Sequence, residues 1–333
     1  MSTKQIVIFM PRFIGDCINC TPAIKLLELS YPDAQITLVL RAVPALVFSR
    51  NTGYKIIIDE RLSNKLRGIL SLVKTLKKQN YDAAILMTNT LIDAVITKAS
   101  GINNVIGYAQ EMRKPLLKKA LKLDTRRHYI NRYAYLANAF CNNKHSILPD
   151  VNLFFDKKQS VLLNIDTLKV GFCIVNKAKL SRHYPTGHCA KTIELINQKV
   201  KEPLSFFLIG SPEEMTEAEQ VVATCQKSNI ENVQSIAGKT TILELIDTIA
   251  DLDLLITVDS GPLHIAAATK TSTIALHSKG TSAFSTVCPK GPQVHVVNSR
   301  GGYIDDNDQV LDLLPEDIAE KALDILNEHN LLH

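Results

Sequence analysis

Short apolar runs alternate with helix-like segments along this chain from end to end. In its first half, runs typical of strands lie at 5–10, 35–40, 55–59, 81–87 and 104–108. Segments with the spacing or the end signals of helices lie at 21–30, 64–79 and 126–140. Strands that alternate with helices form parallel sheets covered on both faces, so the pattern predicts an α/β fold.

The same alternation restarts after a polar, irregular segment at 142–168, in which only 151–155 could form a strand. The later apolar runs lie at 170–175, 204–210, 233–237, 252–258, 272–277 and 294–298. A chain of 333 residues suits two domains of ordinary size. We therefore predict two Rossmann-like, doubly wound domains that face one another across a cleft. We place them at 1–160 and 168–312, with a helix in 313–333 that packs at or near their junction.

Charge, hydropathy and cysteine content exclude several classes of protein. A formal net charge of +5 is too mild to indicate a nucleic-acid partner. No apolar stretch approaches the roughly 20 residues of a membrane span, and we expect a cytoplasmic protein. Seven dispersed cysteines favour reduced thiols. Cys17 and Cys20 form a C-x-x-C pair, but no second ligand pair accompanies them, so we interpret them as small core residues and expect no metal site.

The four residues Asp259-Ser260-Gly261-Pro262 follow an apolar run, as expected where a strand opens into a helix. In parallel sheets, ligands bind at the carboxyl ends of strands, near the point where the strand order reverses. Gly261 permits a tight turn, and Pro262 suits the start of a helix. Such a start offers N–H groups to an anion, and His264 in the first turn adds a donor. The alternative is that Asp259 and Ser260 only cap a structural helix.

The loop after the first predicted strand, 11–17, contains Arg12, Gly15 and Asp16. With a single glycine it matches neither the dinucleotide-binding fingerprint nor the phosphate loop of nucleotide triphosphatases. A carboxylate beside a glycine at the end of a strand could act as a general base. It could equally cap a helix.

Two loops of the second half carry charges suited to a nucleotide. Segment 176–185 includes Lys179 and Arg182, and such a concentration of cations can bind phosphate. A solvated basic loop is the alternative. After the run 204–210, Glu213 or Glu214 could accept hydrogen bonds from a ribose, or could belong to the acidic first turn of a helix.

The order of these motifs resembles that of glycosyltransferase family 9, the ADP-heptose heptosyltransferases of lipopolysaccharide core synthesis. The resemblance spans nearly the whole chain. Its motifs are "GDC…TPAI" (15–24), "HYP" (183–185), "GSPEE" (210–214), "IAGKTTILEL" (236–245) and "DSGPLHIAAA" (259–268). It implies a GT-B type fold of two Rossmann-like domains, in which the N-terminal half holds the acceptor and the C-terminal half holds the nucleotide sugar.

The resemblance also implies roles for individual residues. Asp16 matches the base that deprotonates the acceptor hydroxyl in an inverting transfer. The residues that match donor or phosphate contacts are Lys179, Arg182, Glu213, Glu214, Asp259, Ser260, Gly261 and His264. No cofactor is required, although Mg²⁺ could accompany the diphosphate.

The acceptor is expected to lie against basic residues of the first half. Segment 111–132 carries eight Lys and Arg side chains against Glu111 and Asp124. With Arg12 and Gly15, we select Arg113, Lys114, Arg126 and Arg127 as acceptor contacts. This segment could hold a phosphorylated glycolipid and bring the enzyme to the inner face of the bacterial inner membrane, where each basic residue contributes about 1 kcal/mol. A solvated helix face is the alternative.

Departures from the family pattern keep other functions open. Lys177 and Ala178 stand where the family often has small hydroxyl residues, and 277–281 reads His-Ser-Lys-Gly-Thr where it usually reads close to F/Y-G-P-T. One alternative is transfer of another nucleotide-activated sugar to a capsule or protein acceptor. The other is a non-catalytic protein that binds nucleotide sugars.

Overall fold

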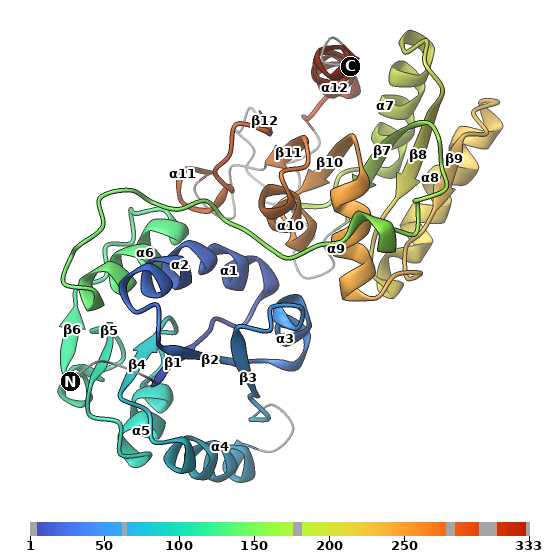
Figure 1. Ribbon diagram of the computed structural model, residues 1–333. Helices are drawn as coiled ribbons and strands as arrows, with labels where there is room; N and C mark the ends of the chain where they lie inside the picture. Colours follow the sequence, from blue (N-terminus) through green and yellow to red (C-terminus); the bar gives the residue numbers. More distant parts are fainter. Residues whose placement is uncertain (1–4, 62–64, 176–181, 278–283, 300–311, 331–333) are drawn as a thin grey trace. The chain divides into compact units, whose positions relative to one another are not determined.

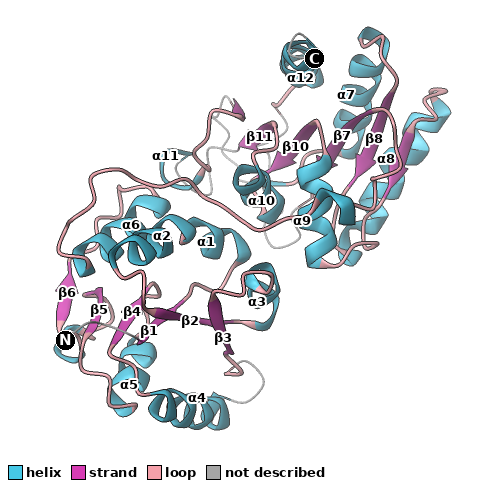
Figure 2. Ribbon diagram, viewed as in Figure 1, coloured by secondary structure: helices cyan, strands magenta, loops and turns pink. Residues whose placement is uncertain are grey.

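The computed structural model describes residues 5–61, 65–175, 182–277, 284–299 and 312–330. The chain divides into two compact units, residues 1–154 and 155–333 (Figure 1). Each unit is built around one six-stranded sheet in which every paired strand runs parallel to its neighbour. Helices flank both sheets (Figure 2). The predicted doubly wound α/β architecture is therefore confirmed.

The first sheet reverses its strand order between β1 and β4. Its strands are β1 (Gln5–Phe9), β2 (Gln35–Leu40), β3 (Tyr54–Ile58), β4 (Ala83–Leu86), β5 (Val105–Tyr108) and β6 (Lys119–Leu121). They lie in the order β3-β2-β1-β4-β5-β6. Ile6 of β1 pairs with Ile36 on one side and with Ala83 on the other. The loops that follow β1 and β4 therefore flank the position where a ligand is expected.

Helices pack on both faces of this sheet. On one face lie α1 (Ile14–Asn19), α2 (Thr21–Ser30) and α6 (Tyr129–Phe140), and on the other α4 (Lys65–Gln79) and α5 (Leu91–Ala99) (Figure 1). The short α3 (Ala42–Phe48) contacts α1 and β3. Leu72 and Leu76 of α4 are buried in one cluster with Val7 and Phe9 of β1. Apolar side chains at helical and strand spacing thus form the core of the first unit.

The second sheet repeats the same order of strands. Its strands are β7 (Leu168–Cys173), β8 (Leu204–Leu208), β9 (Val233–Ser235), β10 (Leu254–Val258), β11 (Thr273–His277) and β12 (Val294–Asn298). They lie in the order β12-β11-β10-β7-β8-β9. The order therefore reverses between β7 and β10, so the loops after these two strands flank the expected ligand position.

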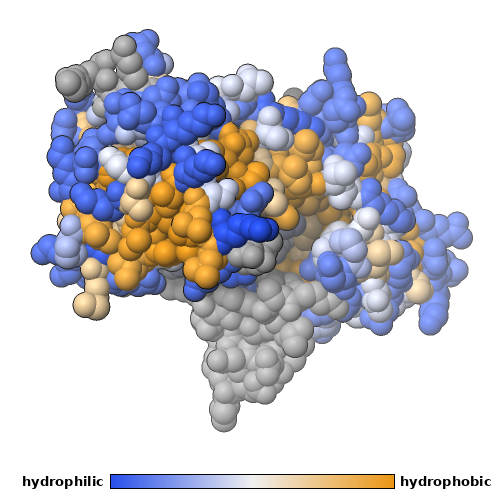
Figure 3. All heavy atoms as spheres, turned by 90° about the horizontal axis from the view of Figure 1, so that it is seen from below, coloured by the Kyte–Doolittle hydropathy of each residue, from blue (hydrophilic) through white to orange (hydrophobic). Residues whose placement is uncertain are grey.

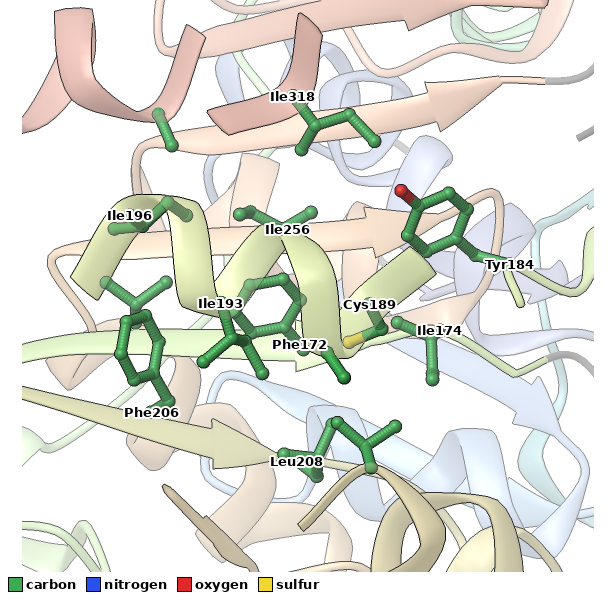
Figure 4. Close-up of a cluster of buried hydrophobic side chains, with 14 of the residues drawn as sticks. Phe172, Ile174, Tyr184, Cys189, Ile193, Ile196, Phe206, Leu208, Ile256 and Ile318 are labelled. Carbon is green, nitrogen blue, oxygen red and sulfur yellow. The ribbon is translucent and has the colours of Figure 1, made fainter. Parts of the chain in front are cut away.

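One large apolar core holds the second unit together (Figure 4). Its helices are α7 (Thr186–Lys199), α8 (Met215–Lys227), α9 (Ile242–Asp251), α10 (Gly261–Thr269), α11 (Phe284–Val287) and α12 (Pro315–Asn330). Phe172 of β7 and Phe206 of β8 lie with ring centroids 6.2 Å apart. Ile193 of α7 and Ile318 of α12 are fully buried in the same cluster. The C-terminal helix is thus part of this core, and its predicted place at a domain junction stays a prediction.

Several local predictions were wrong. Residues 14–19 form α1 and 42–48 form α3, where the sequence suggested no helix. Residues 151–155 form no strand; the Asn152 N–H instead donates to Thr21 Oγ1 at 3.1 Å. The helix expected from residue 126 begins at Tyr129, because His128 Nδ1 accepts a hydrogen bond from the Ile130 N–H.

All seven cysteines are buried, and none forms a disulfide. Cys17 and Cys20 lie in and just after α1, and the Cys17 thiol donates to the Pro11 carbonyl at 3.2 Å. Burial, reinforced by the nearby Asp16 carboxylate, raises the pKa of both thiols. They are core residues with little thiolate character.

Candidate active site

Two loops at the reversal point of the second sheet are joined by an ion pair. Arg182 follows β7 and Asp259 follows β10. Arg182 Nη1 lies 2.7 Å from Asp259 Oδ2 and also donates to the Asp259 carbonyl at 3.0 Å. Both side chains are largely buried, so solvent screens this contact little. The pair therefore fixes a guanidinium beside the start of α10.

The start of α10 is suited to an anion. Ser260 is the N-cap residue, and its side chain makes no capping hydrogen bond. Pro262 is the second residue of the helix, where its missing N–H is not needed. The backbone N–H groups of the first turn and the partial positive charge of the helix dipole are therefore suited to an anion. His264 lies in the same first turn and is half-buried.

A pocket of about 460 Å³ opens beside this helix start. It is lined by Cys173, Val175, Ile209, Gly210, Ser211, Pro212, Glu214, Thr240, Thr241, Ile242, Leu245, Ser260, Gly261 and Pro262. The one-turn helix η4 (Pro212–Glu214) and α9 also begin here, but capping boxes centred on Ser211 and Thr241 bond their first N–H groups. Among these three helix starts, only that of α10 has neither a capping box nor a capping hydrogen bond from a side chain.

The structure separates the two predicted ribose-binding glutamates. Glu214 lines the pocket, and its Oε2 accepts the Ser211 N–H at 2.8 Å as part of the capping box. Glu213 is exposed and is not among the lining residues. Hydrogen bonds from its own backbone N–H and from the Ser211 side chain lower the pKa of Glu213. Glu214 is therefore the better placed of the two to meet a ligand in this pocket.

His277 is a candidate that the sequence analysis did not select. It ends β11, next to β10 in the sheet, and is 2% exposed. Burial lowers the pKa of His277, the Asp259 carboxylate opposes this shift, and the Arg182 guanidinium adds to it. A histidine at the end of a strand carries no sequence signal of this proximity. Lys179 lies outside the described residues.

In the first unit, Asp16 lies at the corresponding reversal point. It is the third residue of α1, which follows β1 after a short loop. The carboxylate is half-buried and lies in the first turn of the helix, where its charge is favoured by the dipole. Gly15 is buried, and the exposed Arg12 stacks its guanidinium 5.6 Å from the Phe13 ring centroid.

A recess of about 320 Å³ opens at the carboxyl edge of the first sheet, beside the loop that leads to α1. Its charged lining residues are Arg12, Arg41, Asp59, Arg61, Lys65 and Asp93. Arg61 bridges the two acids, with Nη2 2.7 Å from Asp59 Oδ2 and Nη1 2.7 Å from Asp93 Oδ1. Burial alone would raise the pKa of Asp59, but hydrogen bonds and charge from Arg61 lower it. Four cations against two carboxylates leave the recess positive.

Arg41 contributes a free donor to this recess. Its Nε lies 3.5 Å from Asp59 Oδ2. Its Nη1 is buried, and within the part of the chain that the structure describes it has no hydrogen-bond partner. A buried donor without a partner is costly, so this nitrogen is suited to an anionic or carbonyl oxygen of a ligand.

Comparison with known proteins assigns the fold to a family. Residues 69–304, more than half of the chain, match the model of glycosyltransferase family 9 (heptosyltransferase). The chain belongs to glycosyltransferase family 9. It is therefore an enzyme of the glycosyltransferase class, as the motifs predicted.

Relatives of this family 9 enzyme match it over nearly full length. The lipooligosaccharide heptosyltransferase 2 of Haemophilus influenzae is 24% identical over 97% of this chain and 99% of its own. The lipopolysaccharide heptosyltransferase 2 of Escherichia coli is 23% identical over 90% and 89%. The solved structure of E. coli ADP-heptose lipopolysaccharide heptosyltransferase II covers 98% of this chain and 99% of its own, with a TM-score of 0.82 and 22% identity. That of a family 9 glycosyltransferase from Veillonella parvula gives a TM-score of 0.84 at 19% identity, covering 98% of each.

Arg113 of the family 9 enzyme does not lie on a surface that could bind an acceptor. Its side chain is 0% exposed. Its nitrogens donate to the carbonyls of Tyr108 at 2.8 Å, Thr88 at 2.7 Å and Thr90 at 3.2 Å. The guanidinium thus fixes the loop between β4 and α5, which is a structural role.

Most of the rest of the predicted basic segment of the enzyme is not a helix face. It forms the one-turn helix η1 (Lys114–Leu116), the edge strand β6, a turn and the first residues of α6. Lys114 is exposed, Arg126 pairs with Asp124 at 3.1 Å, and Arg127 stacks 4.2 Å from the Tyr135 ring centroid. Since Lys119 donates to a backbone carbonyl of α6 as well, several of these cations already have partners.

Membrane-spanning helices and metal clusters are both absent from the described part of this enzyme. Every described helix is too short or too polar to span a bilayer. No three His, Cys, Asp or Glu side chains of the described ranges are grouped to hold a metal ion.

Proposed function

We propose that this enzyme transfers a heptose from ADP-heptose to an inner-core lipopolysaccharide acceptor, with inversion at the anomeric carbon. The observation that carries the proposal is the uncapped start of α10 beside the Arg182–Asp259 pair, at the strand reversal of the second sheet. The printed names of the relatives support the sugar and the acceptor.

The second unit is proposed to hold the donor. The nucleoside would occupy the pocket beside α10, with its ribose near Glu214. The diphosphate would lie against the first N–H groups of α10, next to Arg182 and His264. As the bond between the anomeric carbon and the diphosphate oxygen breaks, negative charge grows on the leaving group. Donors already fixed around that charge lower the barrier.

The first unit is proposed to hold the acceptor. Asp16 would take the proton of the acceptor hydroxyl as its oxygen attacks the anomeric carbon opposite the leaving diphosphate. The positive recess next to the same loop would bind a phosphate or carboxylate of the acceptor, with Arg41 Nη1 as the donor, since this atom has no hydrogen-bond partner within the described structure. Such an acceptor is lipid-linked, and the reaction is proposed to take place at the inner face of the inner membrane.

The protein's own residues are proposed to neutralise the charge of the leaving diphosphate, so that no resident cofactor is required. Transfer should continue in the presence of a chelator such as EDTA. If Mg²⁺ accompanies the diphosphate, adding it back after chelation should raise the rate of transfer. The rates with chelator and with added Mg²⁺ together define the role of the ion.

A thermal-shift panel of ADP-, UDP-, GDP- and CDP-linked sugars tests the donor, because a bound ligand stabilises the folded state by mass action. We expect the largest rise in Tm with ADP-heptose. Release of ADP on addition of a deacylated inner-core acceptor then tests transfer. Binding of ADP-heptose without acceptor-dependent ADP release would instead indicate a non-catalytic protein that binds nucleotide sugars.

A further inference from the structure

Helix α4 of the first unit exposes leucines that its fold does not use. Leu66 is 76% exposed and Leu70 is 70% exposed. The same helix buries Gly68, Leu72 and Leu76 against the sheet. Because the core-facing side is complete without them, Leu66 and Leu70 form an apolar surface directed at solvent.

The charge of α4 has one sign. Residues 65–79 contain five cations and no Asp or Glu. Lys74, Lys77 and Lys78 are exposed, and no ion pair involving them is found among the described residues. With a period of 3.6 residues, these lysines fall on the same side of the helix as Leu66 and Leu70. We refer to the exposed side formed by these five residues as the α4 surface.

The neighbouring helix extends the apolar area. On α5, which contacts α4, Leu91 is 40% exposed and Val95 is 41% exposed. Figure 3 views the protein from below, the side on which α4 and α5 lie in Figure 1, and shows apolar residues of the first unit gathered into a patch bordered by hydrophilic ones. Contiguous apolar patches rimmed by polar residues mark interaction sites.

We propose that the α4 surface docks the first unit on an anionic lipid membrane. A helix that exposes leucines and lysines on the same side, lying parallel to a bilayer, buries the leucines at the headgroup boundary while the lysines meet anionic lipid. An acidic or apolar protein partner would match only one half of this surface. The basic segment 111–132 is less suited, because Arg113 is buried and several of its other cations have partners.

Docking through α4 would also place the recess of the first unit next to the membrane. Lys65 and Ile69 belong to α4, and both line that recess. A lipid-linked acceptor could then reach the recess while its acyl chains stay in the bilayer. This step rests on the proposed function, whereas the docking itself does not.

Flotation of the full-length protein with two kinds of vesicle tests the docking. We expect binding to vesicles that contain phosphatidylglycerol and little binding to vesicles of phosphatidylcholine alone. At about fivefold per charge, the combined K74Q, K77Q and K78Q variant should bind anionic vesicles ~100-fold more weakly. The L66S and L70S double variant should also bind at least ~10-fold more weakly, because it loses two buried apolar side chains.

Matched controls separate the surface from general charge and hydropathy. The K199Q, K201Q and K227Q variant removes the same charge from exposed positions of the second unit. The L29S and I147S variant removes two exposed apolar side chains elsewhere on the first unit, which are 58% and 82% exposed. Both controls should bind like the unaltered protein, and circular dichroism should show that all variants are folded.

Three results would overturn the proposal. The first is an unaltered protein that does not float with anionic vesicles. The second is an equal loss of binding in the matched controls. The third is a dimer in sedimentation that L66S and L70S dissociate, which would assign the surface to a second copy of the chain. A deacylated acceptor, which needs no membrane, separates the docking from the proposed function. The α4 variants should transfer sugar to it at the normal rate. If the unaltered enzyme transfers no sugar to it, that result counts only against the proposed function.

Discussion

Arg182 Nη1 and Asp259 Oδ2 lie 2.7 Å apart, and this contact joins the loops that follow β7 and β10. The pair holds a guanidinium beside the start of α10, which is the one of the three described helix starts at the pocket without a capping box. Neither residue could be paired with the other from the sequence, where they stand 77 positions apart.

Replacing Arg182 with alanine should weaken ADP binding about tenfold or more. A hydrogen bond to a charged group contributes about 1.5–3 kcal/mol, and the change also removes the Arg182 charge that pairs with Asp259 near the proposed position of the diphosphate. Titration calorimetry with ADP measures the effect. K191A, which removes an exposed cation of α7 that pairs with Glu194, is the control. Equal affinities for ADP in R182A and the unaltered enzyme would contradict the role.

Replacing Asp16 with asparagine should leave ADP-heptose binding intact and reduce turnover by ~100-fold or more, the usual contribution of a general base. Single-turnover kinetics with a deacylated acceptor separates the two effects. D33N changes an exposed carboxylate of the same unit and should behave like the unaltered enzyme. Turnover of D16N within twofold of normal would remove Asp16 from the mechanism.

Variants at Arg41 and Arg126 distinguish two candidate acceptor sites, the recess of the first unit and the segment 111–132. If the recess binds the acceptor, R41Q should raise the acceptor KM about tenfold, since it removes a buried donor to an anionic group. The affinity for ADP should not change. R126Q, at an exposed position of the segment 111–132, should leave the KM near its normal value. The reverse result would return the acceptor to that segment.

Arg113 should matter for stability instead of acceptor binding. R113A leaves one buried and two partly buried carbonyls without their donor, and we expect the free energy of unfolding to fall by about 3 kcal/mol. Urea denaturation measures this loss. K114A, at the next and exposed position, should change stability by less than ~0.5 kcal/mol. A stable R113A protein with a raised acceptor KM would indicate that Arg113 does bind the acceptor.

His277 should make folding sensitive to acid. Its pKa lies below the ordinary 6.5 when folded, so the unfolded chain binds more protons near and below that pH. The stability that the neutral, buried imidazole provides is therefore complete above pH 6.5. It is lost as the pH falls toward the lowered pKa, at up to ~1.4 kcal/mol per pH unit. Urea denaturation at pH values from 7.5 to 5 measures the free energy of unfolding. The slope of this free energy against pH should be shallower in H277Q than in the unaltered enzyme. H295Q alters a histidine that is less buried and should change the slope less; equal slopes in H277Q and the unaltered enzyme would contradict the assignment.

The sheets were predictable because buried parallel strands are nearly continuous apolar runs. Strand order was not, since it depends on which strands pair across the sheet. The short α1 was missed because Phe13 at its N-cap carries no capping side chain. The cations of 111–132 were overvalued because sequence spacing does not show that Arg113 faces the interior.

The positive recess was missed for the opposite reason. Arg41, Arg61 and Asp93 are far apart in the sequence and meet only at the edge of the sheet where β3, β2, β1 and β4 end. Asp16, Arg182 and Ser260 could be selected because each lies in a loop that follows a predicted strand and in a motif that resembles the family. Their roles in transfer stay predictions until the variants above are measured.

The burial of every native thiol makes the enzyme convenient for spectroscopy. Maleimide dyes react with accessible thiolates, and the seven native side chains offer none at the surface. One cysteine introduced on an exposed helix position of each unit would therefore take up a donor and an acceptor dye with little background. Energy transfer between the two dyes, recorded with and without nucleotide, would report how far apart the two units are and whether the sugar donor draws them together.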